Sequence, residues 1–412
     1  MKYSRNAARA NAATTIINRL LSKQPEVIEE ATLIRNALLR AAVTWHEKIV
    51  QKISDATAHY QQHNYNRVVN VLRSIVVMVS EPQCEMQRQF LKQYSNNIHF
   101  LNQILKMYRP SRLNQLKNTD ESNPKTLSDR RSINCINQLM SWCENMEEVI
   151  SEEVKRTKTI MLSTISKELN DKENFVLAVP GTYKPNSPVN HIKYFVGQFS
   201  VMQSKQSPKD VIIKGEDGVF YQYLLKGHED LRLDERIMQF FRMINSLMVN
   251  DSLLNMYQIQ TLNVIPLSIS HGLVQWATGT YTLRAIIEQY RKHHSRDPLE
   301  EYLLTDEYGN ANFDFLLPIQ KVAILEKIFN EIPDTDLANF FWLKAPTADT
   351  WLRQIDTYSI SVAINSIVGY IIGLGDRHPS NLLIDRNTGK AIHIDFGDCF
   401  ERAAMRTFLP EI

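Results

Sequence analysis

The chain has 412 residues, of which 43% are hydrophobic and 22% are charged, and its net charge is +2. This length exceeds that of one typical domain, so two or three folded domains are expected. The nearly neutral charge carries no signal for a polyanionic partner, and nucleic acid is therefore not expected to bind.

The first 160 residues are predicted to be helical, because their apolar residues recur at steps of three and four. One long apolar stripe covers 34–60, a second covers 68–79, and a third element is expected at roughly 84–108. The segment 118–132 (NTDESNPKTLSDRRS) is polar and predicted to be a loop. A fourth stripe follows at 136–150. Four amphipathic helices with one apolar face each predict an all-α four-helix bundle.

Strand signals begin after Asn174. Two runs rich in β-branched and aromatic residues flank Asp217-Gly218 and predict a β-hairpin. A helix is expected at 234–250, followed by strands at 261–269 and 272–277. From there to residue 372 the signal is mostly helical. The predicted fold class is α+β: a helical bundle, a small strand-rich lobe with one helix, and a mainly helical lobe.

The four cysteines, Cys84, Cys135, Cys143 and Cys399, form neither a C-x-x-C pair nor a zinc spacing, so reduced thiols are expected. The N-terminal sequence lacks the apolar core of a signal peptide. No apolar run approaches the ~18 residues needed to cross a bilayer, so no transmembrane segment is expected. Reduced thiols indicate the cytoplasm as the expected location, with the nucleus as an alternative.

The stretch GLGDRHPSNLLIDRNTGKAIHIDFGD places charged residues at both ends of an expected hairpin. Residues 382–385 and 391–394 can pair as short antiparallel strands around a turn. Asn381 and Asp395 then lie across from one another at the open end, because paired strands are about 5 Å apart. An amide oxygen and a carboxylate are hard ligands suited to Mg²⁺. The hairpin is therefore predicted to set the distance between two metal ligands.

A second motif precedes this hairpin. Asp376 and Asn381 have the Asp-x4-Asn spacing of a kinase catalytic loop, in which the Asp accepts the hydroxyl proton and the Asn binds metal. Asp395-Phe396-Gly397 supplies the matching D-F-G. Either motif alone is weak, but both together, around a strand–turn–strand of fitting length, indicate phosphoryl transfer. The alternative without a catalytic role is a surface hairpin whose charged ends are solvated.

Phosphoryl transfer also requires a lysine on a strand of the preceding lobe, followed by an acidic helix. Lys226 ends the strand VFYQYLLK and is predicted to neutralise nucleotide phosphates. A carboxylate should hold its ammonium in place, and spacing alone does not choose between Glu229 and Asp234.

Two features depart from ordinary protein kinases. No G-x-G-x-x-G precedes the lysine, and the candidate phosphate loop is VMQSKQSPKD, with Ser204 and Lys205 as donors. The histidine follows the catalytic aspartate, in Asp376-Arg377-His378. His378 could donate to charge that develops on the γ-phosphate, or it could be a structural histidine.

These departures resemble the phosphatidylinositol 3-kinase-related kinases, and several stretches closely resemble the target-of-rapamycin (TOR) group of that family. They are LAVPGTY (177–183), SKQSPK (204–209), LLKGHEDLRLDERIMQ (224–239), VIPLS (264–268) and VGYIIGLGDRHPSNLLIDRNTGKAIHIDFGDCFE (368–401). AAVTWHEKIVQKISDATAHY resembles the start of the family's rapamycin-binding (FRB) domain, and RNAARANAATTIINRL resembles the end of its FAT helical repeats. The resemblance implies FAT at 1–42, an FRB-like bundle at 43–156, a kinase N-lobe at 157–275 and a C-lobe at 276–412.

The resemblance implies a protein serine/threonine kinase that uses ATP with Mg²⁺, or with Mn²⁺, in nutrient and growth signalling. It assigns Asp376 as the catalytic aspartate, His378 as a transition-state donor, Asn381 and Asp395 as metal ligands and Lys226 as a phosphate contact. The implied adenine pocket consists of Met202, Leu224, Trp276, Leu383 and Ile394, with Trp276 at the hinge between lobes.

The family also implies protein partners besides protein substrates: a WD-repeat propeller subunit and the adaptor subunits of TOR complexes. Residues 290–318 occupy the place of the propeller-docking segment. A rapamycin–immunophilin pair would bind at 43–156. Thr57 and Gln61 replace a smaller serine and an aromatic wall there, so weak rapamycin binding is expected.

Ile412 lies within what should be the activation segment, so the C-lobe is expected to be truncated. A fragment of a longer protein is therefore expected, inactive as a kinase by itself.

Three alternatives remain beside the protein kinase. A phosphoinositide lipid kinase would need a basic cluster in the activation segment, where only Arg402 and Arg406 occur. A non-catalytic scaffold would use the helical bundle for recruitment. A metal-dependent hydrolase would rest on His378, His393 and Asp395, but His393 alternates with apolar neighbours on its strand and is expected to face away from such a metal.

Overall fold

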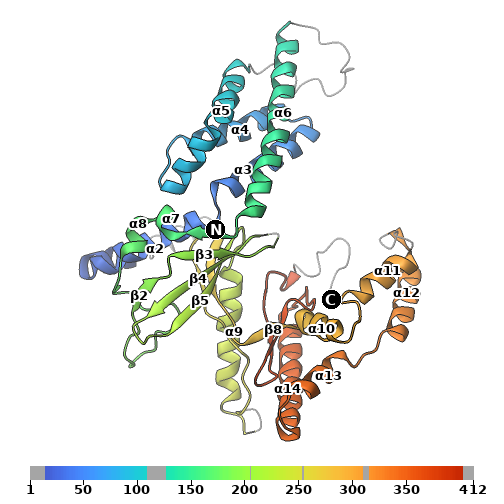
Figure 1. Cartoon of the computed structure of the whole chain (residues 1–412). Coiled ribbons are helices and arrows are strands. Elements are labelled where there is room, and N and C mark those ends of the chain that lie inside the picture. Colours follow the sequence, from blue (N-terminus) through green and yellow to red (C-terminus); the bar gives the residue numbers. More distant parts are fainter. Residues whose placement is uncertain (1–13, 109–126, 205, 253–254, 310–314, 402–412) are drawn as a thin grey trace. The chain divides into compact units, whose positions relative to one another are not determined.

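The structure is a computed structural model that describes residues 14–108, 127–204, 206–252, 255–309 and 315–401 (Figure 1). The chain divides into two compact units, which are described separately. Unit 1 comprises Met1–Leu231 and Val264–Trp276, and unit 2 comprises Arg232–Asn263 and Ala277–Ile412.

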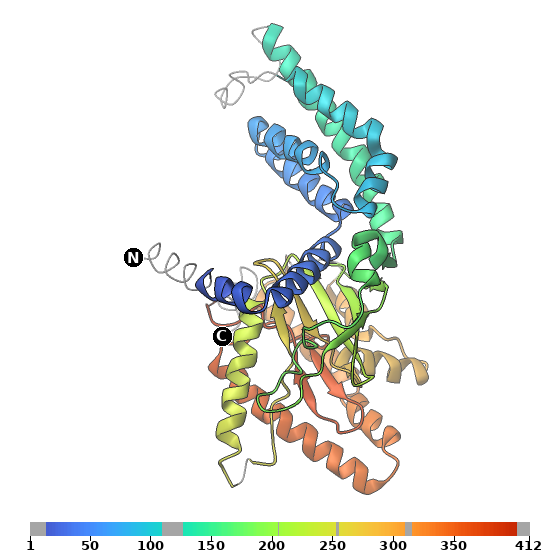
Figure 2. The same cartoon turned by 90° about the vertical axis from the view of Figure 1, so that its left-hand side faces the viewer.

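The helices predicted in the first part of the chain are present in unit 1. They are α3 (Trp45–Gln61), α4 (Tyr65–Val79), α5 (Glu85–Met107) and α6 (Leu127–Arg156). Their apolar faces share one core, in which Ile53, Leu72 and Leu101 are fully buried. Figure 2 shows α3 beside α4 (blue) and α5 beside α6 (cyan to green).

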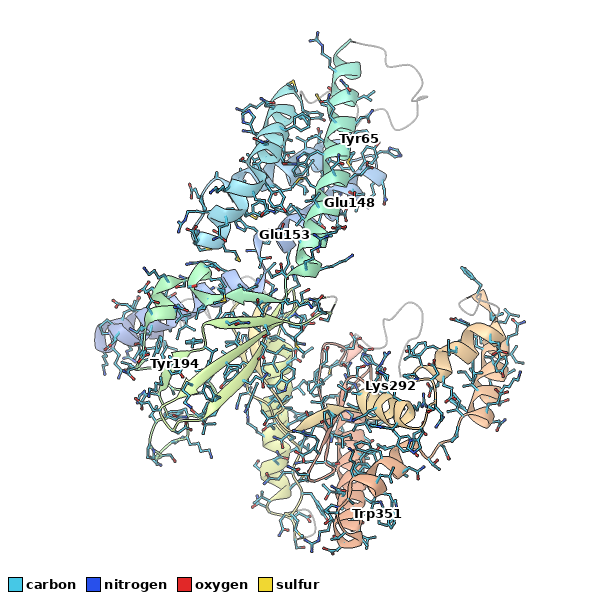
Figure 3. The ribbon with its side chains drawn as sticks, in the orientation of Figure 1. Tyr65, Glu148, Glu153, Tyr194, Lys292 and Trp351 are labelled. Carbon is cyan, nitrogen blue, oxygen red and sulfur yellow. The ribbon has the colours of Figure 1, made fainter. Side chains whose placement is uncertain are left out.

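Polar contacts join α5 to α6. Glu153, on α6 (Figure 3), accepts hydrogen bonds from Tyr94 and from Gln93, the latter at 3.1 Å. The Trp142 indole nitrogen donates to the Asn97 carbonyl at 3.0 Å. A buried indole N–H needs such an acceptor, so the large ring can lie in the core without an unsatisfied donor.

The structure corrects two sequence predictions in this region. The apolar stripe over 34–60 is split between α2 (Pro25–Ala42) and α3, because Thr44 caps the N-terminus of α3. Glu47 completes a capping box with Thr44, which starts a new helix. The segment 118–132 was predicted to be a loop, but α6 begins at Leu127. Residues 118–126 lie outside the described residues.

Unit 1 also contains a seven-stranded sheet, in the order β1-β3-β4-β5-β7-β6, with β2 paired to β4. The strands are β1 (Thr159–Met161), β2 (Ile192–Phe195), β3 (Gln198–Val201), β4 (Lys209–Gly215), β5 (Phe220–Gly227), β6 (Val264–Pro266) and β7 (His271–Gln275). The helix α2 and two short helices, α7 (Leu162–Ile165) and α8 (Lys167–Asp171), pack with the sheet around a second core. These three helices lie side by side (Figure 1).

The predicted hairpin is formed by β4 and β5, with Gly218 at φ +82° in the turn. Alternation divides β5 into two faces. Tyr223 and Leu225 are fully buried in the core, whereas Leu224 and Lys226 are partly exposed on the opposite face.

Unit 2 is mainly helical, and its part from Ala277 onward agrees with the predicted helical lobe. The helix at 232–248, which was predicted as part of the strand-rich lobe, groups with unit 2 instead. The helices of unit 2 are α9 (Arg232–Met248), α10 (Leu283–His293), α11 (Glu300–Gly309), α12 (Pro318–Glu331), α13 (Asp336–Lys344) and α14 (Ala348–Ile371). A small antiparallel sheet in the order β10-β9-β8 combines β8 (Thr280–Thr282), β9 (Leu382–Asp385) and β10 (Ala391–His393). The sequence signal did not predict β8, which is too short to show an alternating pattern.

Buried charges connect three helices of unit 2. The Arg291 guanidinium of α10 contacts Asp336 of α13 at 2.8 Å and Glu301 of α11. Arg291 and Asp336 are both buried, so each needs the other to offset its loss of hydration.

On α14, Trp351 packs edge-on against Trp342 with ring centroids 5.1 Å apart (Figure 3).

All four cysteines are buried, and none of them forms a disulfide. Among the helices in the described part of the chain, none combines the length and the apolar composition that crossing a bilayer requires.

The shared core of α3–α6 predicts a clear difference between two positions on α4. Replacing the fully buried Leu72 with alanine should lower the local free energy of unfolding by about 2–5 kcal/mol, because a cavity is left behind. The matched change Val77→Ala, at a side chain that is 68% exposed, should stay within about 0.5 kcal/mol. Hydrogen exchange of the α3–α6 amides measures both values. Equal losses would contradict the assigned core.

Candidate active site

The hairpin predicted after the GLGD sequence is present. Ala391 pairs with Ile384 and His393 pairs with Leu382 in the antiparallel register of β9 and β10. At the open end, the Ile394 amide donates to the Asn381 carbonyl at 3.1 Å. Asp395 follows at φ +62°, so the strand geometry stops there. The register places Asn381 and Asp395 on neighbouring segments at the same end of the hairpin, as predicted.

The Asn381 side chain is buried, at 7% exposed, and its amide nitrogen and amide oxygen have different roles. Its amide nitrogen Nδ2 donates to the Asp376 carbonyl at 2.9 Å. This bond fixes the side chain and leaves the amide oxygen to act as an acceptor or ligand. An oriented amide oxygen together with the Asp395 carboxylate fits the oxygen ligands that a divalent cation such as Mg²⁺ prefers.

Arg377 holds the turn around Asp376 against the D-F-G segment. Its guanidinium donates to the carbonyls of Gly375 at 2.8 Å, Ile394 at 2.9 Å and Asp395. The guanidinium also lies 5.8 Å from the centroid of the Phe396 ring. Sequence reasoning missed this role, although the D-R-H triplet displays the residue. One side chain therefore connects the two motifs that carry the predicted chemistry.

Phe396 anchors the D-F-G segment. Its ring is 1% exposed and packs edge-on against Phe241 of α9, with centroids 5.4 Å apart. Its backbone amide donates to the Asp234 carboxylate at 3.2 Å. One of the two acidic candidates for the lysine partner therefore contacts the D-F-G backbone.

His378 has a defined orientation. The Ser380 backbone amide donates to its Nδ1 at 3.2 Å. Because Nδ1 accepts this bond, a neutral ring carries its hydrogen on Nε2. His378 can therefore act as a donor through Nε2, which is what the predicted role requires.

Asp376 and Asp395 both have positive φ angles, +59° and +62°. Residues other than glycine rarely occupy this region, although aspartate tolerates it better than most. Unusual backbone at two aspartates of one constellation is typical of sites where side-chain direction matters more than local stability.

Lys226 lies in unit 1, on the partly exposed face of β5. Its Nζ contacts the Glu229 carboxylate at 2.9 Å. Pairing with Gly272 of β7 fixes its backbone. Of the two acidic candidates that spacing left open, Glu229 is therefore shown in an ion pair with Lys226.

The candidate phosphate loop forms a tight turn between β3 and β4. The Met202 amide donates to the Pro208 carbonyl at 2.9 Å, and the Ser207 amide donates to the Ser204 carbonyl at 3.1 Å. We call Met202, Ser204, Ser207 and Pro208 the phosphate turn. Lys205, the second predicted donor, lies outside the described residues.

The predicted adenine-pocket residues fall into two groups, one in each unit. Met202, Leu224 and Trp276 belong to unit 1, where Leu224 shares a strand face with Lys226. Leu383 and Ile394 belong to unit 2, at the hairpin.

His393 was an alternative metal ligand. Burial, assisted by the nearby Arg377 charge, lowers the pKa of His393 to about 4. A neutral ring is therefore expected at physiological pH. Within the described residues, no group of three or more His, Cys, Asp or Glu side chains is placed to hold a metal.

Sequence reasoning also missed three buried polar residues on α14. Ser361 Oγ accepts from the Ala391 amide at 2.9 Å, and Gln354 Nε2 donates to the Asn387 carbonyl at 3.1 Å. Asn365 Nδ2 contacts the Ala391 carbonyl at 3.4 Å. Their spacing of seven and four residues places them on one helical face, and this periodicity could have revealed them.

The hairpin turn allows a matched glycine test. Gly389 and Gly279 have nearly equal φ angles, +76° and +75°. A Cβ at Gly389 would lie 2.7 Å from the Gln354 carbonyl oxygen, whereas one at Gly279 would meet nothing within 4 Å. Gly389→Ala should therefore cost about 1–3 kcal/mol more than Gly279→Ala. Hydrogen exchange of the β9 and β10 amides measures the difference, and equal costs would refute the close packing of the turn on α14.

Two known protein families match parts of the chain. The family described as phosphatidylinositol 3- and 4-kinase matches residues 220–411, and the FKBP12-rapamycin binding domain matches residues 37–127.

The similarity to individual proteins extends over nearly the whole of this chain. The target of rapamycin homolog of Caenorhabditis elegans is 32% identical over 99% of this chain. The serine/threonine-protein kinases TOR2 of Saccharomyces cerevisiae and TOR of Oryza sativa are each 34% identical, over 99% and 98% of the chain. The chain spans only 15–16% of the length of these three relatives. On the combined match of both domains and of nearly the whole chain, the chain belongs to the target-of-rapamycin family of phosphatidylinositol 3-kinase-related kinases.

Proposed function

We propose that this protein transfers the γ-phosphate of ATP to serine or threonine of protein substrates, in nutrient and growth signalling. The observation that carries the proposal is a pair of hydrogen bonds at the open end of the hairpin. Asn381 donates to the Asp376 carbonyl, and the Ile394 amide, next to Asp395, donates to the Asn381 carbonyl. The relatives named as serine/threonine-protein kinases support the reaction type.

Asp376 is the proposed proton acceptor for the substrate hydroxyl. A carboxylate positioned beside the attacking oxygen orients it and takes its proton as the bond to phosphorus forms. His378 is the proposed donor to charge that develops on the transferred phosphoryl group, because its Nε2 carries the hydrogen when Nδ1 accepts from Ser380.

Asn381 and Asp395 are the proposed ligands of Mg²⁺ or Mn²⁺, which when bound would neutralise phosphate charge. Lys226 is the proposed phosphate contact in unit 1. The Glu229 carboxylate, 2.9 Å from its Nζ, restrains the long lysine side chain.

The remaining nucleotide contacts and the domain division are also proposed from the family resemblance. We propose that Ser204 and Lys205 contact phosphate and that Met202, Leu224, Trp276, Leu383 and Ile394 contact adenine. We also propose the domain division at 1–42, 43–156, 157–275 and 276–412, with a four-helix FRB-type bundle in the second segment. The shared core of α3–α6 and the match to the FKBP12-rapamycin binding domain support that bundle.

Partners and location are proposed from the family. Residues 290–318 would dock a WD-repeat propeller subunit, and their helix α11 is held by the buried Arg291. Adaptor subunits of TOR complexes would bind elsewhere. The proposed location is the cytoplasm, including endomembrane surfaces reached through such partners, or the nucleus.

The proposed reaction predicts large losses from single substitutions. In the complete protein, Asp376→Ala and Asp395→Ala should each lower phosphate transfer from labelled ATP to a protein substrate by about 100-fold or more, because each removes a transition-state interaction. Asp356→Asn, at an exposed aspartate of α14, should leave the rate unchanged.

Two outcomes would contradict these assignments. Transfer by Asp376→Ala or Asp395→Ala at the wild-type rate would remove the residue from its role. Transfer to phosphoinositide vesicles in preference to protein would favour the lipid-kinase alternative.

Rapamycin binding gives a second prediction. Thr57 is partly buried, and its hydroxyl donates to the Ile53 carbonyl at 3.1 Å, whereas Gln61 is exposed. Wild type should bind an immunophilin–rapamycin pair weakly. Thr57→Ser with Gln61→Phe should tighten binding by about tenfold, because space and an aromatic wall are restored.

The control is Gln62→Phe, which adds the same ring at the neighbouring exposed position and should not improve binding. Calorimetry measures the binding affinities of the wild type, the double variant and the control. Tight binding by wild type would show that Thr57 and Gln61 do not weaken the pocket.

A further inference from the structure

A buried ion pair connects the helical part of unit 1 to its sheet. Lys209, the first residue of β4, is 1% exposed. Its Nζ donates to Glu47 Oε1 at 2.6 Å and to the Ala42 carbonyl at 2.8 Å. Burial lowers the pKa of Lys209, and the Glu47 carboxylate opposes that shift. A buried ammonium of this kind is stable only where it is paired.

Glu47 performs two tasks with its two oxygens. Oε2 accepts from the Thr44 backbone amide at 2.6 Å and from the Thr44 hydroxyl at 2.9 Å, which caps α3. Oε1 accepts from Lys209. The start of α3 is therefore fixed directly to the first residue of β4.

Lys209 lies at the base of the phosphate turn. Its partner in β3 is Val201, and the turn between them is closed by the bond from Met202 to Pro208. On its other side Lys209 pairs with Leu225, the residue before Lys226. The buried pair is thus one residue from the phosphate turn and adjacent to the strand that carries the proposed phosphate-binding lysine.

The segment before α3 also touches that strand. A Cβ on Gly227 would lie 2.4 Å from Val43 Cγ2 and 3.0 Å from the Ala42 carbonyl oxygen. The same short segment therefore packs against the end of β5 and accepts a hydrogen bond from Lys209 at the start of β4.

We propose that Glu47 is a positioning residue for ATP: through Lys209 it holds the phosphate turn and the adjoining end of β5 in the geometry that binds nucleotide phosphates. This inference rests on the proposed kinase function. It also assigns the first turn of the rapamycin-binding region a role in nucleotide binding, separate from any ligand of that region.

The first test does not depend on activity. Hydrogen exchange in the complete protein, followed in peptides covering 198–209, should become about tenfold faster at the phosphate turn in Glu47→Gln, which leaves the buried ammonium without its counter-charge. Lys209→Met should have a similar effect, and Lys209→Arg should restore exchange close to wild type. The double variant should exchange no faster than either single variant, because both remove the same interaction.

A matched control is available in unit 1. Lys172 contacts Glu30 at 3.1 Å, and Glu30 is also buried. Its carboxylate accepts from the amides of Val176 and Leu177, away from the phosphate turn. Lys172→Met removes an ion pair in which the carboxylate is the buried partner, and it should leave exchange at the turn unchanged. Equal acceleration in this control would reduce the Glu47 effect to general destabilisation and overturn the proposal.

The second test uses kinetics. Glu47→Gln should raise the KM for ATP about fivefold with kcat changed less than about twofold, because ground-state positioning of the nucleotide is lost rather than the proton acceptor. A fall in kcat with unchanged KM would overturn the proposal. Unchanged exchange at the turn would also overturn it, even if Asp376→Ala abolishes transfer. If exchange at the turn accelerates in Glu47→Gln but the wild-type protein shows no kinase activity, the coupling between Glu47 and the phosphate turn stands. The proposed kinase function is then wrong.

Discussion

The guanidinium of Arg377 is the constraint on which the proposed chemistry of unit 2 depends. It binds carbonyls on both sides of the hairpin opening, those of Gly375 and Ile394 among them. A planar group with five fixed donors can hold several carbonyls at once, which an ammonium cannot do with the same directionality. The side chain therefore compensates for two aspartates with positive φ, which would otherwise relax toward ordinary backbone geometry.

The hairpin needs support from behind, and α14 provides it with polar residues. Ser361, Asn365 and Gln354 are all buried, and each contacts the backbone of β10 or of the turn. A hydrocarbon face would pack against the hairpin in many registers, whereas hydrogen bonds to particular backbone groups specify one. The close approach at Gly389 acts in the same direction, because only a residue without a Cβ fits against the Gln354 carbonyl.

Local patterns predicted the elements of this fold well where one short motif decides the geometry. The β9–β10 hairpin, the β4–β5 hairpin and α9 follow from turn residues and periodicity within a few positions. The split between α2 and α3 was missed because an apolar stripe continues through it, while Thr44 and Glu47 start a new helix by capping its N-terminus. The pairing of Lys226 with Glu229 depends on the local course of the chain after β5, and the role of Arg377 depends on tertiary distances. Residue spacing alone contains neither.

Two lysines on adjacent strands of the sheet show how the face to which a side chain points determines its role. Lys209 and Lys226 lie on adjacent strands, and Lys209 is paired with Leu225. Because successive side chains alternate, Lys226 must point to the opposite face from Leu225 and Lys209. Lys209 therefore enters the core and requires Glu47, whereas Lys226 stays partly exposed beside Glu229. The same residue type becomes a structural cation on one face and a proposed phosphate ligand on the other, and a shift of one residue in register would exchange these roles.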